Sequence, residues 1–313
     1  MSDLPRTVKI KEVGPREGFQ FEKGGISLAD KISLVDALTD TGVKTIEFTS
    51  FVSPKWVPQM ADAEQMVDGI KQRPGVEYEA IWLNVAGLER AAQFRSRLHL
   101  RPMFGVAGSD TFMRKNTNRS VNERIEELPS WAERYQALGM DWIDVGVMAA
   151  FGSNYAGDEE PRHVVRVLEK VEDKARACGS RLGGIGLADT MGWANPLQTK
   201  RVVGMVRERW PDTPVKLHFH DTRALAIANV VAALEMGIDC FDSAVAGMGG
   251  AGNITTEDLV FLCQELGIDT GIDLDAMIEA GQLAERVVGH PLPGKLKSGG
   301  NLEKYRARAR AAV

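Results

Sequence analysis

Two histidines stand two residues apart in the segment VKLHFHDT (215–222), although the chain of 313 residues contains only five histidines. Side chains alternate across a β-strand, so His218 and His220 are expected to point to one face, with Asp221 on the other. Two imidazoles at one depth of a strand end, together with a carboxylate, suit a divalent metal ion. The alternative is a pair of core histidines that bond to backbone carbonyls.

Polar residues at the ends of other apolar runs could complete such a site. They are Arg16 and Glu17 in GPREGFQ, Glu47 in TIEFTSF, Asp189 in LGGIGLAD, and Asn253 in the glycine-rich turn GMGGAGN. Oxygen donors beside two imidazoles favour an octahedral site with open positions, which suits Mg²⁺ or Mn²⁺. Zinc is less favoured because no thiolate lies nearby in the sequence. We therefore expect a divalent metal ion, Mg²⁺ or Mn²⁺, as the cofactor.

Eight short β-rich runs alternate with amphipathic segments and must position these residues. The runs span 8–14, 45–51, 78–84, 98–106, 141–147, 182–189, 215–221 and 240–248. Helical spacing is found between them, as in 28–42 and 126–139, which both end in a glycine suited to a helix C-cap. The repeats predict an α/β protein, a (β/α)8 TIM barrel, whose functional groups lie at the C-terminal ends of the strands. A doubly wound open sheet is the alternative, but no GxGxxG motif follows the first run.

Composition limits the domain organisation and the classes of partner. We expect residues 1–290 to form a barrel domain and residues 291–313, which are basic and contain glycine, to form a short C-terminal extension. The net charge of -5 argues against a general nucleic-acid binder. No apolar run is long enough for a membrane span. The N-terminus lacks the apolar segment of a signal peptide, and the three cysteines show no CxxC spacing, so a cytoplasmic protein is predicted.

Several motifs together resemble the 3-hydroxy-3-methylglutaryl-CoA lyases. The motifs are EVGPREGFQ, IEFTSFVSPKWVPQMAD, FMRKNTNRS, LADTMG, HFHDT, and VAGMGG followed by GN and TEDLV. The resemblance extends from about Val8 to Gly271. Some of these motifs are shared with a wider metal-dependent barrel family, which includes isopropylmalate and homocitrate synthases and pyruvate-dependent aldolases. The resemblance implies an enzyme that makes or breaks a carbon–carbon bond beside a carbonyl group.

The resemblance also implies roles for the candidate residues. The metal ligands would be Glu17, His218, His220 and Asn253. Arg16 would stabilise negative charge on the substrate carbonyl or enolate oxygen, and Glu47 would orient Arg16 or act as a base. Asp189 would hold a coordinated water or a histidine.

Basic residues in the loops predicted to surround the site indicate a negatively charged substrate. Lys55 follows the second run, and Arg114 and Lys115 follow the fourth. They would bind a carboxylate or the phosphates of coenzyme A, although a solvated loop is the alternative. Tyr155, after the fifth run, is a candidate proton donor, and an ordinary tyrosine of a lid loop is the alternative. An acyl-CoA or hydroxy acid is the expected small-molecule substrate, and we also expect a homo-oligomer.

Two departures from the lyases affect the expected chemistry. Glu17 stands where the lyases usually have Asp, but one further methylene still reaches a metal ion. In the lyases the turn after strand eight is longer and holds a cysteine, whereas here Gly249–Gly250 runs almost directly into Ala251–Gly252–Asn253. Neither Cys240 nor Cys263 replaces that thiol by position, and both are expected in the core. We therefore expect a thiol-independent reaction and a more open site, which would admit a bulkier acyl chain.

The predicted function is metal-dependent cleavage of a 3-hydroxyacyl-CoA by retro-Claisen or retro-aldol chemistry. Three alternatives stay open from the sequence. The first is a Claisen-type synthase, although such synthases usually carry a longer C-terminal region. The second is a pyruvate-dependent aldolase. The third is a barrel that binds a metal ion and a ligand without catalysis.

Overall fold

A computed structural model describes residues 4–250 and 252–311. Internal contacts divide the chain into two compact units. The central unit is built from Leu100–Asp242, and the terminal unit joins Arg6–His99 to the part of the chain that begins at Ser243. The terminal unit is therefore discontinuous in sequence.

The structure contains eight parallel strands, and each is followed by at least one helix. These strands are β1 (Lys9–Glu12), β2 (Thr45–Ser50), β3 (Glu77–Ile81), β4 (Met103–Ala107), β5 (Trp142–Met148), β8 (Arg181–Asp189), β9 (Val215–Phe219) and β10 (Cys240–Ser243). A small antiparallel hairpin after β5 pairs β6 (Gly152–Ser153) with β7 (Gly157–Asp158).

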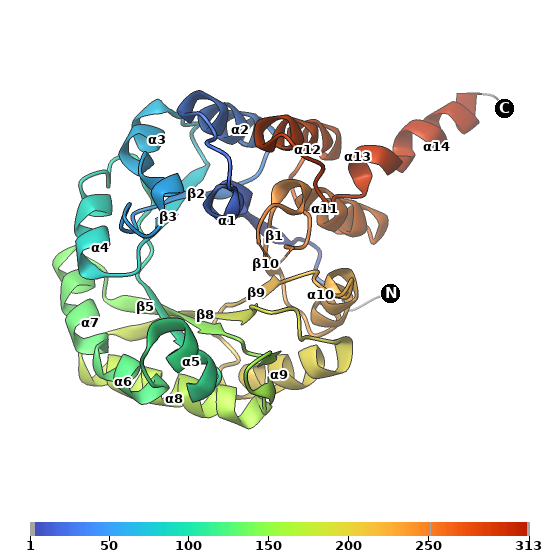
Figure 1. Cartoon of the computed structure of the whole chain (residues 1–313). Coiled ribbons are helices and arrows are strands. Elements are labelled where there is room, and N and C mark those ends of the chain that lie inside the picture. Colours follow the sequence, from blue (N-terminus) through green and yellow to red (C-terminus); the bar gives the residue numbers. More distant parts are fainter. Residues whose placement is uncertain (1–3, 251, 312–313) are drawn as a thin grey trace. The chain divides into compact units, whose positions relative to one another are not determined.

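Along the chain, most helices come between one strand and the next, and Figure 1 labels them. In the terminal unit they are α1 (Gly14–Phe21), α2 (Leu28–Asp40), α3 (Ala63–Gly69), α4 (Val85–Ala92), α11 (Thr256–Glu265), α12 (Leu274–Val288), α13 (Leu296–Gly299) and α14 (Leu302–Ala311), with short 3₁₀ turns η1 (Pro58–Met60) and η2 (Val245–Gly247). In the central unit they are α5 (Asp110–Thr117), α6 (Val121–Glu126), α7 (Leu128–Ala137), α8 (Pro161–Ala177), α9 (Pro196–Arg209) and α10 (Ala226–Glu235).

Strand order follows sequence order within each unit. In the terminal unit β1 pairs with β2, and β2 with β3. In the central unit β4 pairs with β5, β5 with β8, β8 with β9, and β9 with β10. A doubly wound sheet would reverse its strand order at a switch point, and neither unit contains such a reversal among its described strands. The pairing therefore favours successive (β/α) repeats.

Each predicted strand is present, and the fourth and eighth differ most from their predicted bounds, by five residues at one end. The fourth begins at Met103 and not at residue 98, because Pro102 lacks an N–H for the ladder and the strand starts after it. The eighth ends at Ser243, since the predicted part from 244 to 248 instead forms the turn η2 around Ala246, whose φ is 54°. This turn leads directly into the glycines that precede Asn253.

Apolar faces of the helices cover the strands. In α8 the residues Val164, Val167, Leu168 and Val171 recur at helical spacing and are buried. Figure 1 shows α7 and α8 on the outer side of β5 and β8. Among the described residues, no helix is both long and apolar enough to cross a membrane.

The C-terminal helix α14 has no buried residue and is held by ion pairs, such as that of Arg306 with Glu265 at 2.7 Å. The division into a barrel of residues 1–290 and an extension of residues 291–313 stays a prediction.

Candidate active site

Helix α1 begins directly after β1 and carries Arg16 and Glu17. It lies against the segment that follows β10, and glycine makes this approach possible. A Cβ atom at position 14 would lie 2.6 Å from Oε1 of Glu12, and one at position 18 would overlap Met248. Any larger side chain at Gly14 or Gly18 would therefore displace the helix that carries the first two candidate residues.

The guanidinium group of Arg16 is held by two carboxylates. Its Nε donates to Oε1 of Glu47 at 2.5 Å, and a terminal nitrogen lies 2.8 Å from Oε1 of Glu17. Lys11 of β1 lies 2.5 Å from Glu47 and 2.6 Å from Glu79 of β3. This buried network fixes the direction of Arg16, because its Nε and one terminal nitrogen are both engaged.

Asn253 is held in one orientation by its amide nitrogen. This nitrogen donates to Oε2 of Glu17 at 2.9 Å and to the carbonyl oxygen of Met248 at 2.7 Å. The amide oxygen Oδ1 is buried and has no hydrogen-bond partner among the described residues. A buried acceptor without a donor costs free energy unless a cation or another donor meets it. Beside the carboxylate of Glu17, this oxygen fits the role of a metal ligand.

Glu12, the last residue of β1, joins α1 to the turn η2 from a fully buried position. Its Oε1 accepts hydrogen bonds from the backbone N–H groups of Gly14 at 2.7 Å and Val245 at 2.9 Å. Its Oε2 accepts from the hydroxyl of Thr256 at 2.5 Å. One side chain thereby fixes both the start of the helix that carries Glu17 and the turn that leads to Asn253.

A second buried carboxyl, Glu257, supports the same turn and accepts from the N–H of Ala246 at 3.0 Å. Burial raises the pKa of Glu12 to about 7 and that of Glu257 to about 8, because desolvation outweighs their hydrogen bonds. Negative charge on Glu12 contributes further to the raised pKa of Glu257. Both carboxyls therefore hold a proton to a higher pH than an exposed glutamate does.

We predict that Glu12→Gln removes a pH dependence of stability. Glu12 binds its proton more tightly in the folded chain than in the unfolded chain, so its contribution to stability is full below about pH 4.5 and is lost as the pH rises through about 7. The loss is on the order of 3 kcal/mol for a pKa raised by this amount. Gln keeps an oxygen for Gly14 and Val245 and offers an N–H to Thr256. Urea unfolding at pH 5 and pH 8 should therefore show a smaller difference in the variant than in the native chain.

Glu279→Gln, at an exposed position of α12, is the matched control and should leave the difference unchanged. An equal pH difference in the native chain and Glu12→Gln would contradict the role of the Glu12 proton.

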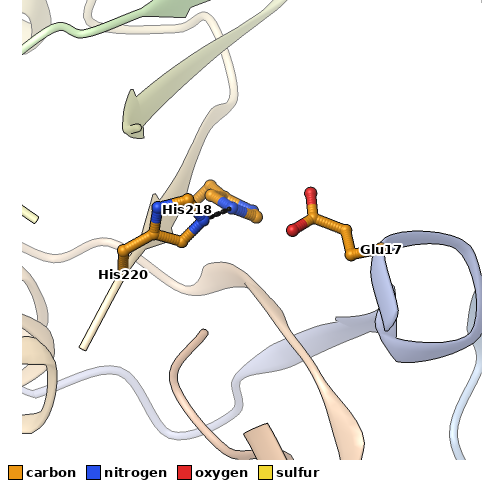
Figure 2. Close-up of side chains that lie close together, drawn as sticks. All are labelled: Glu17, His218 and His220. Carbon is orange, nitrogen blue, oxygen red and sulfur yellow. Dashed lines mark hydrogen bonds between the residues drawn. The ribbon is translucent and has the colours of Figure 1, made fainter. Parts of the chain in front are cut away.

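The two histidines predicted to share a face do so in the central unit. Figure 2 shows the His218 and His220 rings facing each other, with their Nε2 atoms 3.1 Å apart. Nδ1 of His220 donates to the carbonyl oxygen of Thr190 at 2.8 Å. Nδ1 of His218 lies 3.4 Å from Oδ2 of Asp242, which itself is paired with Lys216.

These contacts determine which nitrogen of each ring bears the proton. A carbonyl oxygen only accepts, so the proton of neutral His220 is on Nδ1, and the carboxylate of Asp242 favours the same tautomer of His218. Either one Nε2 carries a proton that it donates to the other, or both Nε2 lone pairs are available to a bound cation. Imidazoles that donate through Nδ1 to a carbonyl or a carboxylate are typical of metal ligands. The histidine pair therefore fits a divalent ion.

Asp189, the last residue of β8, shapes the turn beside the histidines. Its Oδ1 accepts from the N–H groups of Trp193 at 2.6 Å and Ala194 at 3.1 Å. Its Oδ2 is buried and has no hydrogen-bond partner in the part of the chain that the structure describes. Burial raises the pKa of Asp189, against the lowering effect of these two hydrogen bonds and of the nearby histidines. Asp189 and the carbonyl that holds His220 thus belong to one turn.

Comparison with known proteins gives consistent results. The family model described as HMGL-like matches residues 7–284. A Pseudomonas aeruginosa protein named 3-hydroxy-3-isohexenylglutaryl-CoA/hydroxy-methylglutaryl-CoA lyase is 38% identical over 92% of this chain and 95% of its own length. The crystal structure of the Bacillus subtilis HMG-CoA lyase has a TM-score of 0.86 at 35% identity, covering 94% of this chain and 98% of that chain.

A third relative is described with bound ligands. It is an HMG-CoA lyase from Acinetobacter baumannii in complex with coenzyme A and 3-methylmalate, with a TM-score of 0.85 at 33% identity, covering 96% of this chain and 97% of that one. The chain belongs to the HMGL-like family. Membership confirms three predictions from the sequence: the family, the (β/α)8 barrel and a carbon–carbon lyase.

The candidate substrate-binding residues of this HMGL-like chain lie in exposed loops and helices. Lys55 is in the loop after β2, with its Nζ 5.6 Å from the centroid of the Trp56 ring. Arg114 and Lys115 lie on the exposed side of α5. Tyr155, between β6 and β7, packs its half-exposed ring 6.2 Å from Phe112 of α5. The structure thus brings Tyr155 to the helix of Arg114 and Lys115.

The cysteines of the HMGL-like chain lie as predicted, apart from the partial exposure of Cys240. Cys263 is buried in α11, and burial raises its pKa to about 12, so its thiol is protonated at neutral pH. Cys240 begins β10 and is half-buried, and Cys178 caps α8. Ala251 of the shortened turn lies outside the described residues.

Sequence reasoning missed Lys11, Glu12, Glu79 and Asp242, which support candidate residues from within strands. Their strands were recognised, but alternation alone does not tell which buried charge meets which partner.

Proposed function

We propose that this HMGL-like chain is a divalent-metal-dependent lyase that cleaves a 3-hydroxyacyl-CoA whose acyl group is bulkier than that of 3-hydroxy-3-methylglutaryl-CoA. The observation that carries the proposal is the chemistry of the candidate ligand atoms. The Nε2 atoms of His218 and His220 lie 3.1 Å apart, and Oδ1 of Asn253 is buried with no hydrogen-bond partner among the described residues. Imidazole nitrogen and amide oxygen are both ligands for a divalent ion, and a buried acceptor without a donor costs free energy.

The proposed ligand set is the one that the resemblance implied from the sequence. It consists of Glu17, Asn253, His218 and His220. Two nitrogens and two oxygens without sulfur favour Mg²⁺ or Mn²⁺ over zinc. When bound, such an ion is a Lewis acid that makes the substrate hydroxyl more acidic.

In the proposed reaction the hydroxyl at C3 loses its proton, and its oxygen forms the new carbonyl group. The C2–C3 bond breaks, and its electron pair passes to the thioester enolate, which takes up a proton to give an acyl-CoA. Arg16 stabilises the negative charge that develops on oxygen, and Glu47 fixes the Arg16 side chain through the hydrogen bond to Nε. Asp189 holds the turn that orients His220 and keeps Oδ2 available to accept a further hydrogen bond.

The substrate class follows from charge and from the relatives. Lys55, Arg114 and Lys115 would bind the phosphates of coenzyme A or a carboxylate, and Tyr155 would act as a proton donor or cover the substrate. Two relatives support this class: one is named for an isohexenyl substrate as well as the methyl one, and another is described in complex with coenzyme A and 3-methylmalate. The shortened turn before Asn253 would leave room for the larger substituent. Cytoplasmic location and a homo-oligomer stay predictions.

A panel of thioesters tests the proposal. The purified chain with Mn²⁺ should cleave a 3-hydroxyglutaryl-CoA that carries a long alkyl group at C3 and should turn over 3-hydroxy-3-methylglutaryl-CoA weakly. The products are identified by mass spectrometry of the acyl-CoA and the released keto acid. Efficient turnover of the methyl compound would contradict the substrate part of the proposal, and cleavage of no member would contradict the reaction.

The rate should not depend on a thiol. Changing Cys178, Cys240 and Cys263 each to Ser, singly and together, is expected to leave kcat/KM within a few-fold, because none of them belongs to the proposed ligand set or the proposed catalytic residues. Steady-state kinetics with the long-chain thioester, before and after thiol alkylation, provide the measurement. A loss of about 100-fold in any single variant would show that a cysteine takes part in the reaction.

A further inference from the structure

Phe21 exposes a large apolar ring one helical turn away from Glu17. It is the last residue of α1 and is 56% exposed. Residues four apart lie on the same face of a helix, so Phe21 and Glu17 share a face of α1. An exposed phenylalanine needs no explanation by itself. Phe21 is of interest because it lies beside Glu17, a proposed metal ligand.

The ring of Phe21 lies against the shortened turn that leads to Asn253. A Cβ atom on Gly250 would lie 2.6 Å from Cδ1 of Phe21, and one on Gly249 would lie 3.5 Å from Oε2 of Glu17. The two glycines are consecutive: Gly249 lies next to the Glu17 carboxylate, and Gly250 lies next to the Phe21 ring. The Phe21 ring and the Glu17 carboxylate, which we assign as a metal ligand, therefore lie next to neighbouring residues of one turn.

The contacts of α1 explain why the ring stays in this place. Gly14 and Gly18 let the helix touch Val245 and Met248, and the hydrogen bond from Asn253 to Glu17 holds the same two segments together at 2.9 Å. Phe21, at the end of the same helix, contacts Gly250 of this turn and keeps about half of its surface exposed. It is thus an exposed apolar surface on the helix that carries Arg16 and Glu17.

We propose that Phe21 is a specificity-determining residue that contacts the alkyl substituent at C3 of the substrate. This inference rests on the proposed function and adds a residue to it. The polar groups of Arg16, Glu17 and Asn253 suit the hydroxyl and carbonyl oxygens of a substrate. Phe21 offers what a long alkyl group needs, because its ring loses contact with water when such a group covers it. A methyl group is too short to cover much of the ring.

Phe21→Ser and Phe21→Leu test this role against two thioesters, 3-hydroxy-3-methylglutaryl-CoA and its analogue with a six-carbon alkyl group at C3. Phe21→Ser should lower kcat/KM for the long compound by about 10-fold or more relative to the methyl compound, the range for an apolar contact in a specificity pocket. Phe21→Leu keeps an apolar side chain and should keep the ratio within roughly 3-fold of the native value. Tyr305→Ser on α14, a residue with a matching exposure of 57%, should leave both rates unchanged.

The possible results separate the residue from the reaction. Equal losses of kcat/KM for both thioesters in Phe21→Ser would mean that the ring only supports Glu17. Unchanged kcat/KM values for both would mean that the ring does not touch the substituent. Either result overturns the inference and leaves the proposed function standing. Cleavage of neither compound by the native chain would overturn the proposed function and Phe21's role with it. Thermal unfolding of each variant shows whether the fold is retained.

Discussion

A chelator should abolish turnover of the long-chain thioester, and Mg²⁺ or Mn²⁺ should restore it. His220→Ala should in addition weaken Mn²⁺ binding by about 100-fold or more, since loss of an outer-shell partner alone costs 10–100-fold and this change removes a ligand. The His218 ring, held through Nδ1, would then face an open position. Mn²⁺ affinity is measured by electron paramagnetic resonance, which does not depend on activity.

His163→Ala is the matched control for this prediction. His163 lies in the same unit and bonds to the carboxylate of Glu159 at 3.1 Å, so it tests the loss of a histidine contact without the proposed ligand set. Equal Mn²⁺ affinity in the native chain and His220→Ala would contradict the metal site. So would a crystal grown with Mn²⁺ that gives no anomalous signal between His218 and His220.

Arg16→Gln and Arg16→Met should lower kcat by about 10²- to 10³-fold, the effect of losing one donor to a developing oxyanion. KM should change much less, because the substrate carbonyl carries little of that charge in the ground state. Rates over a range of thioester concentrations separate the two parameters. A rise in KM with kcat unchanged would make Arg16 a binding group.

Arg90→Gln supplies a comparison with an arginine that lies outside the proposed ligand and catalytic residues. Arg90 also donates through Nε to a glutamate, Glu64, at 2.8 Å in the same unit. Its loss should change stability and leave kcat within a few-fold. Glu47→Gln should fall between the two, since Arg16 remains but its Nε loses a charged acceptor.

The parts of the site carried by strands could be predicted from the sequence. His218 and His220 share a face because of the period of two, and Asp189 stands at a strand end because its apolar run stops there. The eight runs likewise matched eight strands, since each apolar stretch had the length of a buried strand and lay between helical patterns.

Helix α1 could not be predicted from its residues. The segment GPREGFQF contains two glycines and a proline, which locally favour a turn. It forms a helix because glycine lets it pack directly against Val245 and Met248, residues more than 220 positions away. Tertiary contact therefore overrides local preference at the point where Arg16 and Glu17 are placed.

Buried charges were equally hidden in the sequence. Glu12 and Lys11 are adjacent in β1, yet one is engaged by backbone N–H groups and a hydroxyl and the other by two carboxylates. Alternation predicts that they point to opposite faces, but it does not name the partner on either side. Only the register of the neighbouring elements determines that a carboxyl with a pKa of about 7 holds the turn before Asn253.

The discontinuity of the terminal unit has a consequence for the order of events on the ribosome. Glu12 and Glu17 bond to Val245, Thr256 and Asn253, which are made 233 to 244 residues later. At about 5–20 residues per second, the nascent helix α1 waits roughly 10 to 50 s for these partners. Leu100–Asp242 is continuous and has no such wait. A nascent chain therefore exposes Phe21 and the carboxyls of Glu12 and Glu17 until synthesis is nearly complete, which makes this interval the one in which a chaperone would matter most.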